Sequence, residues 1–349
     1  MDEHIVASQG MYLDRNDFVG EAIWDRLNED AVASDGAPSA LRPTTRTSSD
    51  GRTVTEAAKP SPVPTGSVAD QITTSTLPAA VDQSVSVKDN ALLDTLRTAA
   101  EQAESTPTLD RRPMPGINFG LHNRDLPTLW VTAELAAQVR EEGQPVPWVT
   151  FVQRLRSAAQ RAGEDLRHLD RLSGTGVKVA IGFPKPGDKA RNSEDRLVST
   201  ALGGPTRAGV TGPAFLLGLV AADDPTAPRP AVAPTPEALR LLSDLLARGL
   251  VTALPHPDDV TIRWMEHVAA CAPEEHAAWM AVLTAVRGNP SRLELVSMFP
   301  EWEGSRADTN CTGYVSRGRE WGLVTPELFD GRYSLTTLGE HILHGRAAK

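Results

Sequence analysis

Residue types that perform catalysis or bind metal ions occur in this chain, but not at productive spacings. The two cysteines, Cys271 and Cys311, are far apart and outside any Cys-x-x-Cys pattern that would hold zinc. His341 and His344 are three residues apart on an expected helix, a spacing that is more typical of a solvated face than of a ligand pair. We therefore expect no metal site and no cofactor.

Two further segments contain parts of ligand-binding motifs. His256-Pro-Asp-Asp259 has metal-ligand types, but it follows a helix end and precedes a short apolar run, so we interpret it as the tip of a hairpin. Ser173-Gly-Thr-Gly-Val-Lys178 is rich in glycine, lacks the full spacing of a phosphate-binding loop and leads into an expected strand. No nucleophile, histidine and acid lie together on a recognisable catalytic scaffold, and the sequence predicts a protein that is not an enzyme.

Basic and polar side chains that suit nucleic acid remain. The net charge is −10, but residues 151–233 hold 12 basic and 8 acidic side chains, the only positive excess in the chain. The candidate phosphate contacts there are Arg154, Arg161, Lys178, Lys185, Lys189 and Arg191. Towards the C-terminus the candidates are Thr309, Asn310, Thr312, Ser316, Arg317 and Arg319 on the exposed side of an expected helix, with Arg332 in a following turn.

Caps and turns divide the C-terminal residues into helices and a hairpin. Residues 274–287 read as a helix closed by Gly288, and a capping box from Ser291 to Glu294 opens a second helix. A third helix, residues 308–321, turns its apolar side chains to the core and ends before Gly322. Asp330-Gly331 predicts a hairpin turn, and residues 337–343 form a closing helix.

The stretch GLVTPELFDGRYSLTTLGEHIL resembles the wing and final helix of bacterial winged-helix regulators of the MarR, PadR and ArsR type. The resemblance covers about sixty residues, without the added C-terminal dimerisation helices of those families, and implies a fold whose third helix meets DNA. The matching residues are Gly322, Leu323, Val324, Asp330, Gly331, Arg332, Leu335, Thr336 and Gly339.

The middle of the chain has a similar order of signals. A helix over residues 132–142 ends at Gly143, and a longer one follows Pro147 with a possible break at Gly163. Alternating apolar residues at 177–184 predict a strand that leads into a basic wing tip at residues 185–189. Upstream of the C-terminal unit, Gly218-Leu-Val220 before Thr235 echoes Gly322-Leu-Val324 before Thr336. The echo suggests tandem winged helices.

The N-terminal residues have a different composition. Residues 31–115 are rich in Ser, Thr, Pro and Ala and are expected to form a disordered linker. Two short amphipathic helices are expected, at residues 16–30 and at residues 91–103, and each could dock a partner or pack on its own chain. The docking side chains of the first would be Phe18, Ile23, Trp24 and Leu27.

Together these signals predict a mainly α protein with small β-hairpins and tandem winged-helix modules after a long disordered region. The expected divisions are residues 1–30 (docking segment), 31–115 (linker), 116–233 (basic winged-helix-like module), 234–272 (connecting helices) and 273–349 (C-terminal winged helix). We expect a cytoplasmic chain without a signal peptide or membrane span.

The function expected from these features is binding of double-stranded DNA without catalysis. The protein would be a transcriptional regulator, or the DNA-recognising subunit of a plasmid, segregation or phage-defence system. The alternative is a non-catalytic adaptor that uses its winged helices and its N-terminal helix to bind other proteins.

Overall fold

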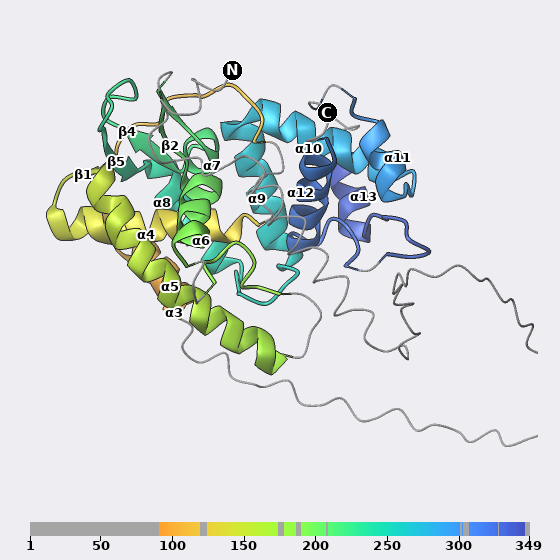
Figure 1. Ribbon diagram of the computed structural model, residues 1–349, viewed down its shortest axis with the longest axis horizontal. Helices are drawn as coiled ribbons and strands as arrows, with labels where there is room; N and C mark the ends of the chain where they lie inside the picture. The colour runs from red at the N-terminus through yellow and green to blue at the C-terminus, as the bar shows by residue number, and fades with distance from the viewer. Residues whose placement is uncertain are drawn as a thin grey trace, which may run out of the picture. The chain divides into compact units, whose positions relative to one another are not determined.

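The described part of the chain is mainly helical and has small antiparallel sheets (Figure 1). The computed structural model describes residues 91–118, 124–173, 178–185, 190–206, 209–300, 302, 307–326 and 328–345. The docking helix expected at residues 16–30 lies outside these ranges, as do the first sixty residues of the expected linker. No helix among the described residues is long and apolar enough to cross a membrane.

The last part of the expected linker is folded, which corrects its C-terminal boundary. Helix α3 (Ala91–Glu101) buries Leu92, Leu93, Leu96 and Ala99 against α4 (Leu126–Glu142) and α8 (Pro236–Ala247). The short η1 (Ala103–Ser105) follows, and the backbone N–H of Leu109 donates to the Pro234 carbonyl at 3.2 Å. The helix expected at residues 91–103 is therefore present, and it packs on its own chain.

Helices α4 and α5 (Trp148–Ser173) form the next layer, joined by β1 (Val146–Pro147). Helix α4 ends at Gly143 with a φ of 66°, as the sequence predicts, but it begins six residues earlier than expected. The break expected at Gly163 is absent. A Cβ at Gly163 would lie 2.6 Å from the Pro184 carbonyl oxygen, so the glycine permits a close approach of the following segment.

The strand expected at residues 177–184 is wrong. Residues 179–183 form turns, in which the backbone N–H groups of Val179 and Ala180 donate to the Asp170 carboxylate at 2.7 and 3.1 Å. Alternation over so few residues does not distinguish a strand from turns, which here bury Val179, Ala180 and Phe183. Because no strand forms here, Lys185 is not at a hairpin tip, and residues 186–189 lie outside the described chain.

Short elements follow and build two sheets. They are α6 (Ala190–Leu197), η2 (Val198–Leu202), β2 (Gly204–Thr206), β3 (Gly209–Thr211), α7 (Pro213–Leu216), β4 (Val220–Ala222) and β5 (Ala231–Pro234). Strands β2 and β3 pair with each other, and the other sheet has the antiparallel order β1-β5-β4. Its register places Val220 opposite Pro234, directly before α8.

Helix α9 (Asp258–Cys271) begins where the sequence suggested a hairpin tip, so that expectation is wrong. Asp258 and Asp259 occupy the first turn of the helix after Pro257. Acidic side chains are favourable there because the helix dipole is positive at its N-terminus. Helix α9 packs against both α8 and α10 (Pro273–Val286), and Figure 1 shows it between these two helices.

The C-terminal elements match the expected order. Helix α11 (Arg292–Ser297) has the capping box of Ser291 and Glu294, α12 (Ala307–Glu320) ends before Gly322, and α13 (Thr337–His344) closes the unit. Asp330 and Gly331 have positive φ values of 50° and 71°, which confirms the expected turn. Isolated bridges join Val324 to Leu335, Phe329 to Arg332 and Ser291 to Arg332, and we call residues 323–335 the wing.

The first Gly-Leu-Val segment ends one helix and anchors the next. Gly218 has a φ of 66°, and the Leu219 N–H donates to the Ala214 carbonyl at 2.8 Å, which is a Schellman helix end. Thr235, the N-cap of α8, donates its hydroxyl to the Gly218 carbonyl at 2.7 Å and its N–H to the Leu219 carbonyl at 3.1 Å.

The second segment repeats these contacts. Gly322 has a φ of 63°, and the Leu323 N–H donates to the carbonyl five residues earlier at 2.7 Å. Thr336, the N-cap of α13, donates its hydroxyl to the Gly322 carbonyl and its N–H to the Leu323 carbonyl at 2.5 and 3.1 Å. The sequence echo is therefore also a repeat of backbone geometry.

One hydrophobic core runs from Leu92 to Leu338 and includes the buried Trp130, Trp264, Trp279 and Trp321. Residues 86–349 form one compact unit. The boundaries expected after residues 233 and 272 fall inside this unit.

Candidate functional site

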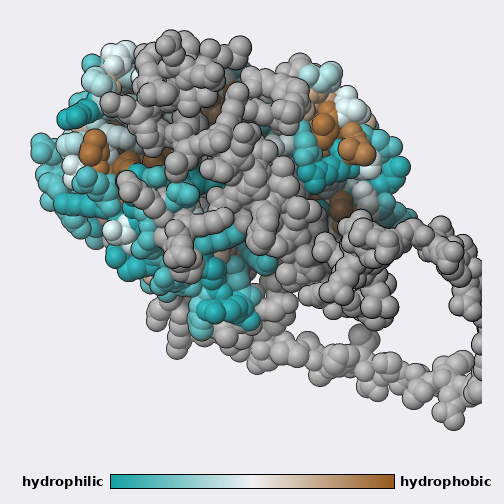
Figure 2. Space-filling model, in the orientation of Figure 1, coloured by the Kyte–Doolittle hydropathy of each residue, from teal (hydrophilic) through white to brown (hydrophobic). Residues whose placement is uncertain are grey.

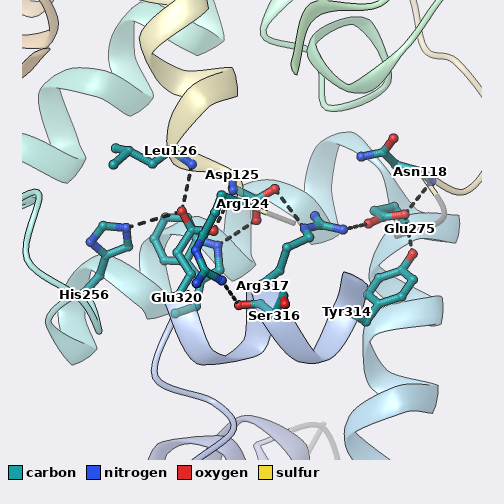
Figure 3. Close-up of polar contacts among 11 residues, drawn as sticks. Asn118, Arg124, Asp125, Leu126, His256, Glu275, Tyr314, Ser316, Arg317 and Glu320 are labelled. Carbon is teal, nitrogen blue, oxygen red and sulfur yellow. Dashed lines mark hydrogen bonds and ion pairs between the residues drawn. The ribbon is translucent and has the colours of Figure 1, made fainter. Parts of the chain in front are cut away.

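A group of buried charges joins the start of α4 to α10 and α12 (Figure 3). The Arg317 side chain is fully buried. Its Nε donates to Asp125 Oδ1 at 3.0 Å and its Nη1 donates to Glu275 Oε1 at 2.6 Å. Burial lowers the pKa of Arg317, but the two carboxylates outweigh this effect and hold the pKa above its ordinary value. Arg317 is therefore charged, and its burial keeps the guanidinium out of contact with water.

Both carboxylates accept further hydrogen bonds. Trp321 Nε1 donates to Asp125 Oδ2 at 2.7 Å. The Tyr314 hydroxyl and the Asn118 backbone N–H each donate to Glu275 Oε2 at 2.7 Å. Burial, assisted by the charge of Glu275, raises the pKa of Tyr314 well above its usual value, so this tyrosine remains a donor.

Glu320 takes the place of a local N-cap for α4. Its Oε2 accepts from the Asp125 N–H at 2.6 Å and its Oε1 accepts from the Leu126 N–H at 2.9 Å. The side chain of Asp125, the residue at the N-cap position, makes no capping bond. Burial, with the nearby charge of Asp125, raises the pKa of Glu320 to about 8.

The His256 imidazole lies against Glu320 and Trp321. Its Nε2 is 3.9 Å from Glu320 Oε1, and its ring centre is 4.6 Å from that of Trp321. Burial lowers the pKa of His256 to about 3, so the imidazole is neutral and the contact is not an ion pair at neutral pH. Beside them, Arg124 donates to the Ser316 carbonyl.

This arrangement is better suited to holding distant segments of the chain together than to catalysis. The carboxyl groups of Asp125, Glu275 and Glu320 are occupied by protein donors. A cavity of about 770 Å³ lies elsewhere, between α3, α8 and α9. No group of three or more histidine, cysteine or acidic side chains in the described chain is arranged to hold a metal ion. The cluster connects segments about 190 residues apart in sequence through charge-assisted hydrogen bonds.

The exposed face expected on the third C-terminal helix is wrong for three of its residues. Asn310, Thr312 and Arg317 are 2%, 3% and 0% exposed. Arg317 is held between α10 and the segment that starts α4, and Asn310 donates to the Trp302 carbonyl. Thr309 and Ser316 are half-buried. Arg319 is also half-buried, donates to the Thr325 carbonyl at 3.2 Å and lies 5.8 Å from the Tyr333 ring centre.

Several of the candidate phosphate contacts have acidic neighbours. Arg154 pairs with Glu141 and Glu142 at 3.4 and 3.1 Å, and Arg332 pairs with Glu294 at 2.9 Å. The positive charge of Arg161 acts on Glu134 of the adjacent helix.

Of the remaining basic candidates, two have side chains that the structure describes and two do not. Lys178 and Lys185 are exposed. Lys189 lies outside the described residues, and the side chain of Arg191 also does, although its backbone belongs to α6.

Sequence reasoning missed Asp125 and Glu275 as partners of Arg317, and Glu320 as the cap of α4. Glu275 looks like an ordinary acid in the first turn of a helix, and Asp125 looks like part of a loop. The available signal was that Tyr314 and Trp321 lie about one helical turn before and after Arg317, but this spacing does not identify partners so distant in sequence. No family model, curated protein or solved structure matches the chain.

Proposed function

We propose that this protein is a non-catalytic adaptor built on tandem winged-helix units that bind other proteins. The observation that carries the proposal is the burial of Arg317 between Asp125 and Glu275. The helix that would read DNA in the C-terminal unit serves instead as part of the core.

The order of elements supports the winged-helix assignment. In the first winged-helix unit, from α4 to α8, β1 follows α4 and pairs with β5, which also pairs with β4, and α8 follows. In the second winged-helix unit, from α10 to α13, Ser291 follows α10 and pairs with the returning strand of the wing, which also pairs with Val324, and α13 follows. The matched helix ends and N-caps at Gly218 and Gly322 support the same assignment.

The requirements for base reading favour an adaptor over a regulator. A recognition helix must present several side chains to the major groove. Half-buried Thr309, Ser316 and Arg319 are the least covered of the candidates on α12, and Arg319 is already engaged by the wing. Freeing Arg317 would leave Asp125 and Glu275 as uncompensated buried charges, which costs several kcal/mol.

Duplex DNA remains a second candidate partner, through the first unit alone. Lys178 and Lys185 are exposed, and both lie within the only stretch with a positive excess. Such a contact would be sequence-independent, because phosphates carry no base information.

Fluorescence anisotropy with a labelled random duplex across a salt series tests the choice. The adaptor proposal expects no salt-dependent binding near physiological ionic strength. DNA binding would instead give a log–log salt slope that flattens by about two units in the Lys178→Ala/Lys185→Ala double variant, since each phosphate contact contributes about 0.9. Arg287→Ala, an exposed arginine in the other unit, is the matched control. A slope that responds to the two lysines but not to Arg287 overturns the adaptor proposal.

A further inference from the structure

Four exposed apolar side chains lie on α11, directly after it and on the wing. Leu293, Met298, Leu328 and Phe329 are 83%, 51%, 49% and 79% exposed. Among the described residues, Val149 at 47% is the other large hydrophobic side chain with comparable exposure. Figure 2 shows apolar surface in the region that α11 occupies in Figure 1. We call these four side chains the α11–wing surface.

The backbone brings the two parts of this surface together. Ser291, directly before α11, pairs with Arg332, which pairs in turn with Phe329 across the wing. Because neighbouring strands are about 5 Å apart, Ser291 and Phe329 are within about 10 Å of each other. Arg332 also donates to the Glu294 carboxylate at 2.9 Å, which fixes the wing against the helix.

The charges around the surface are largely matched within the chain. Arg292 donates to Asp308 at 2.7 Å, and Arg332 pairs with Glu294. Hydrogen bonds from the Ser291 backbone and side chain, and from Arg332, lower the pKa of Glu294 and keep it ionised. Among the described residues of the turn, Asp330 adds one negative charge. An identical surface would therefore meet little electrostatic repulsion, whereas a strongly charged partner would find little unmatched charge to attract it.

We propose that the α11–wing surface binds a second copy of this chain and forms a twofold-symmetric dimer. A twofold contact must be complementary to itself, which an apolar surface flanked by matched ion pairs satisfies. The four side chains expose on the order of 100 Å² each, so two copies together remove on the order of 800 Å² from these side chains, an area typical of a weak and transient contact. We therefore expect a weak dimer whose population increases over the micromolar range.

This dimer does not depend on the proposed adaptor role, because it follows from exposure and charge alone. It also requires no additional dimerisation helices after α13. Each chain contributes one such surface, so association closes at two copies and does not continue into filaments.

Sedimentation velocity of the full-length chain from about 1 to 300 µM tests the dimer. We expect a shift from monomer to dimer across this range. The Leu293→Glu/Phe329→Glu double variant should remain monomeric, because four like charges would meet in the dimer. Val149→Glu is the matched control, because it replaces an exposed hydrophobic residue at the second position of α5, where Leu293 has the second position of α11.

Melting curves should be nearly unchanged in both variants, since the substituted side chains are exposed. A chain that remains monomeric at the highest concentration overturns the proposal. A dimer that persists in the double variant also does so, because another surface would then hold it. Equal loss of the dimer in Val149→Glu overturns it as well, since the effect would not be specific to the α11–wing surface.

Discussion

At the scale of single residues, Arg317 illustrates how one side chain type serves opposite purposes. A guanidinium on a helix can read a base or fill a core, and the choice depends on which carboxylates reach it. The local pattern of α12 correctly placed Cys311, Val315 and Trp321 in the core. It could not reveal that Asp125 pairs with Arg317, because that residue is 192 positions away.

Replacing Arg317 should reveal its structural role. We expect Arg317→Ala to lower the free energy of unfolding by about 3–5 kcal/mol, because Asp125 and Glu275 would remain buried without their cation. Urea denaturation followed by tryptophan fluorescence measures the change. The exposed Arg287→Ala should stay within about 0.5 kcal/mol of the parent protein. Unchanged stability of Arg317→Ala would mean that the buried ion pairs do not form in solution.

At the scale of elements, local chemistry predicted some boundaries well and others poorly. The capping box at Ser291, the helix ends at Gly143 and Gly322, and the turn at Asp330 depend on the conformational preferences of one to four residues. The conformation of the segment expected as a strand at residues 177–184 depends instead on the elements that pack against it. Its tight approach to Gly163 and its bonds to Asp170 decide the turns, and neither is visible in an alternating pattern.

Helix α3 shows that average composition can predict disorder where a helix forms, and it gives a second prediction. Its sequence lies in a region whose average composition predicts disorder, yet its apolar side chains are buried on α4 and α8. We expect Leu96→Ala to cost about 2–5 kcal/mol of unfolding free energy, the usual range for a fully buried leucine.

Limited proteolysis provides a second measurement on the same helix. The stable fragment should begin before residue 91, and a fragment beginning near residue 115 would contradict the packing of α3. Arg97→Ala on the exposed side of α3 is the control, and it should change stability by less than about 0.5 kcal/mol.

At the scale of the whole molecule, the expected modules are joined by contacts that no local signal shows. The mainly helical class and the small antiparallel sheets followed from caps, turns and periodicity. The union of residues 86–349 did not, because it depends on α9 packing against helices on both sides and on charges that meet across the chain. Hydrophobic periodicity shows that a helix has a buried face, but not which element covers it.

The stability of the whole protein should depend on pH through three buried groups. Burial lowers the pKa of His256 to about 3 and that of His267 to about 4, so their contribution is lost as pH falls below about 6.5, where the unfolded chain binds their protons. Burial raises the pKa of Glu320 to about 8, so its contribution is lost as pH rises from about 4.5 to 8. Together the three groups place maximum stability near pH 6.5.

Urea denaturation from pH 5 to 9 checks this profile. Glu320→Gln should weaken the decline in stability between pH 6.5 and 8, whereas the exposed Glu274→Gln should leave it in place. An unaltered decline in Glu320→Gln would assign the dependence to other groups.

The cap that Glu320 gives to α4 also bears on how the chain folds during synthesis. Glu320 accepts the backbone N–H of Leu126 from 194 residues further along the chain. At about 5–20 residues per second, a ribosome needs roughly 10–40 s to translate the intervening segment. Throughout that interval the nascent α4 lacks its acceptor and Asp125 lacks its cation. The cap of α4 therefore forms only after the C-terminal helices have left the exit tunnel, which gives ribosome-associated chaperones that interval in which to bind the nascent α4.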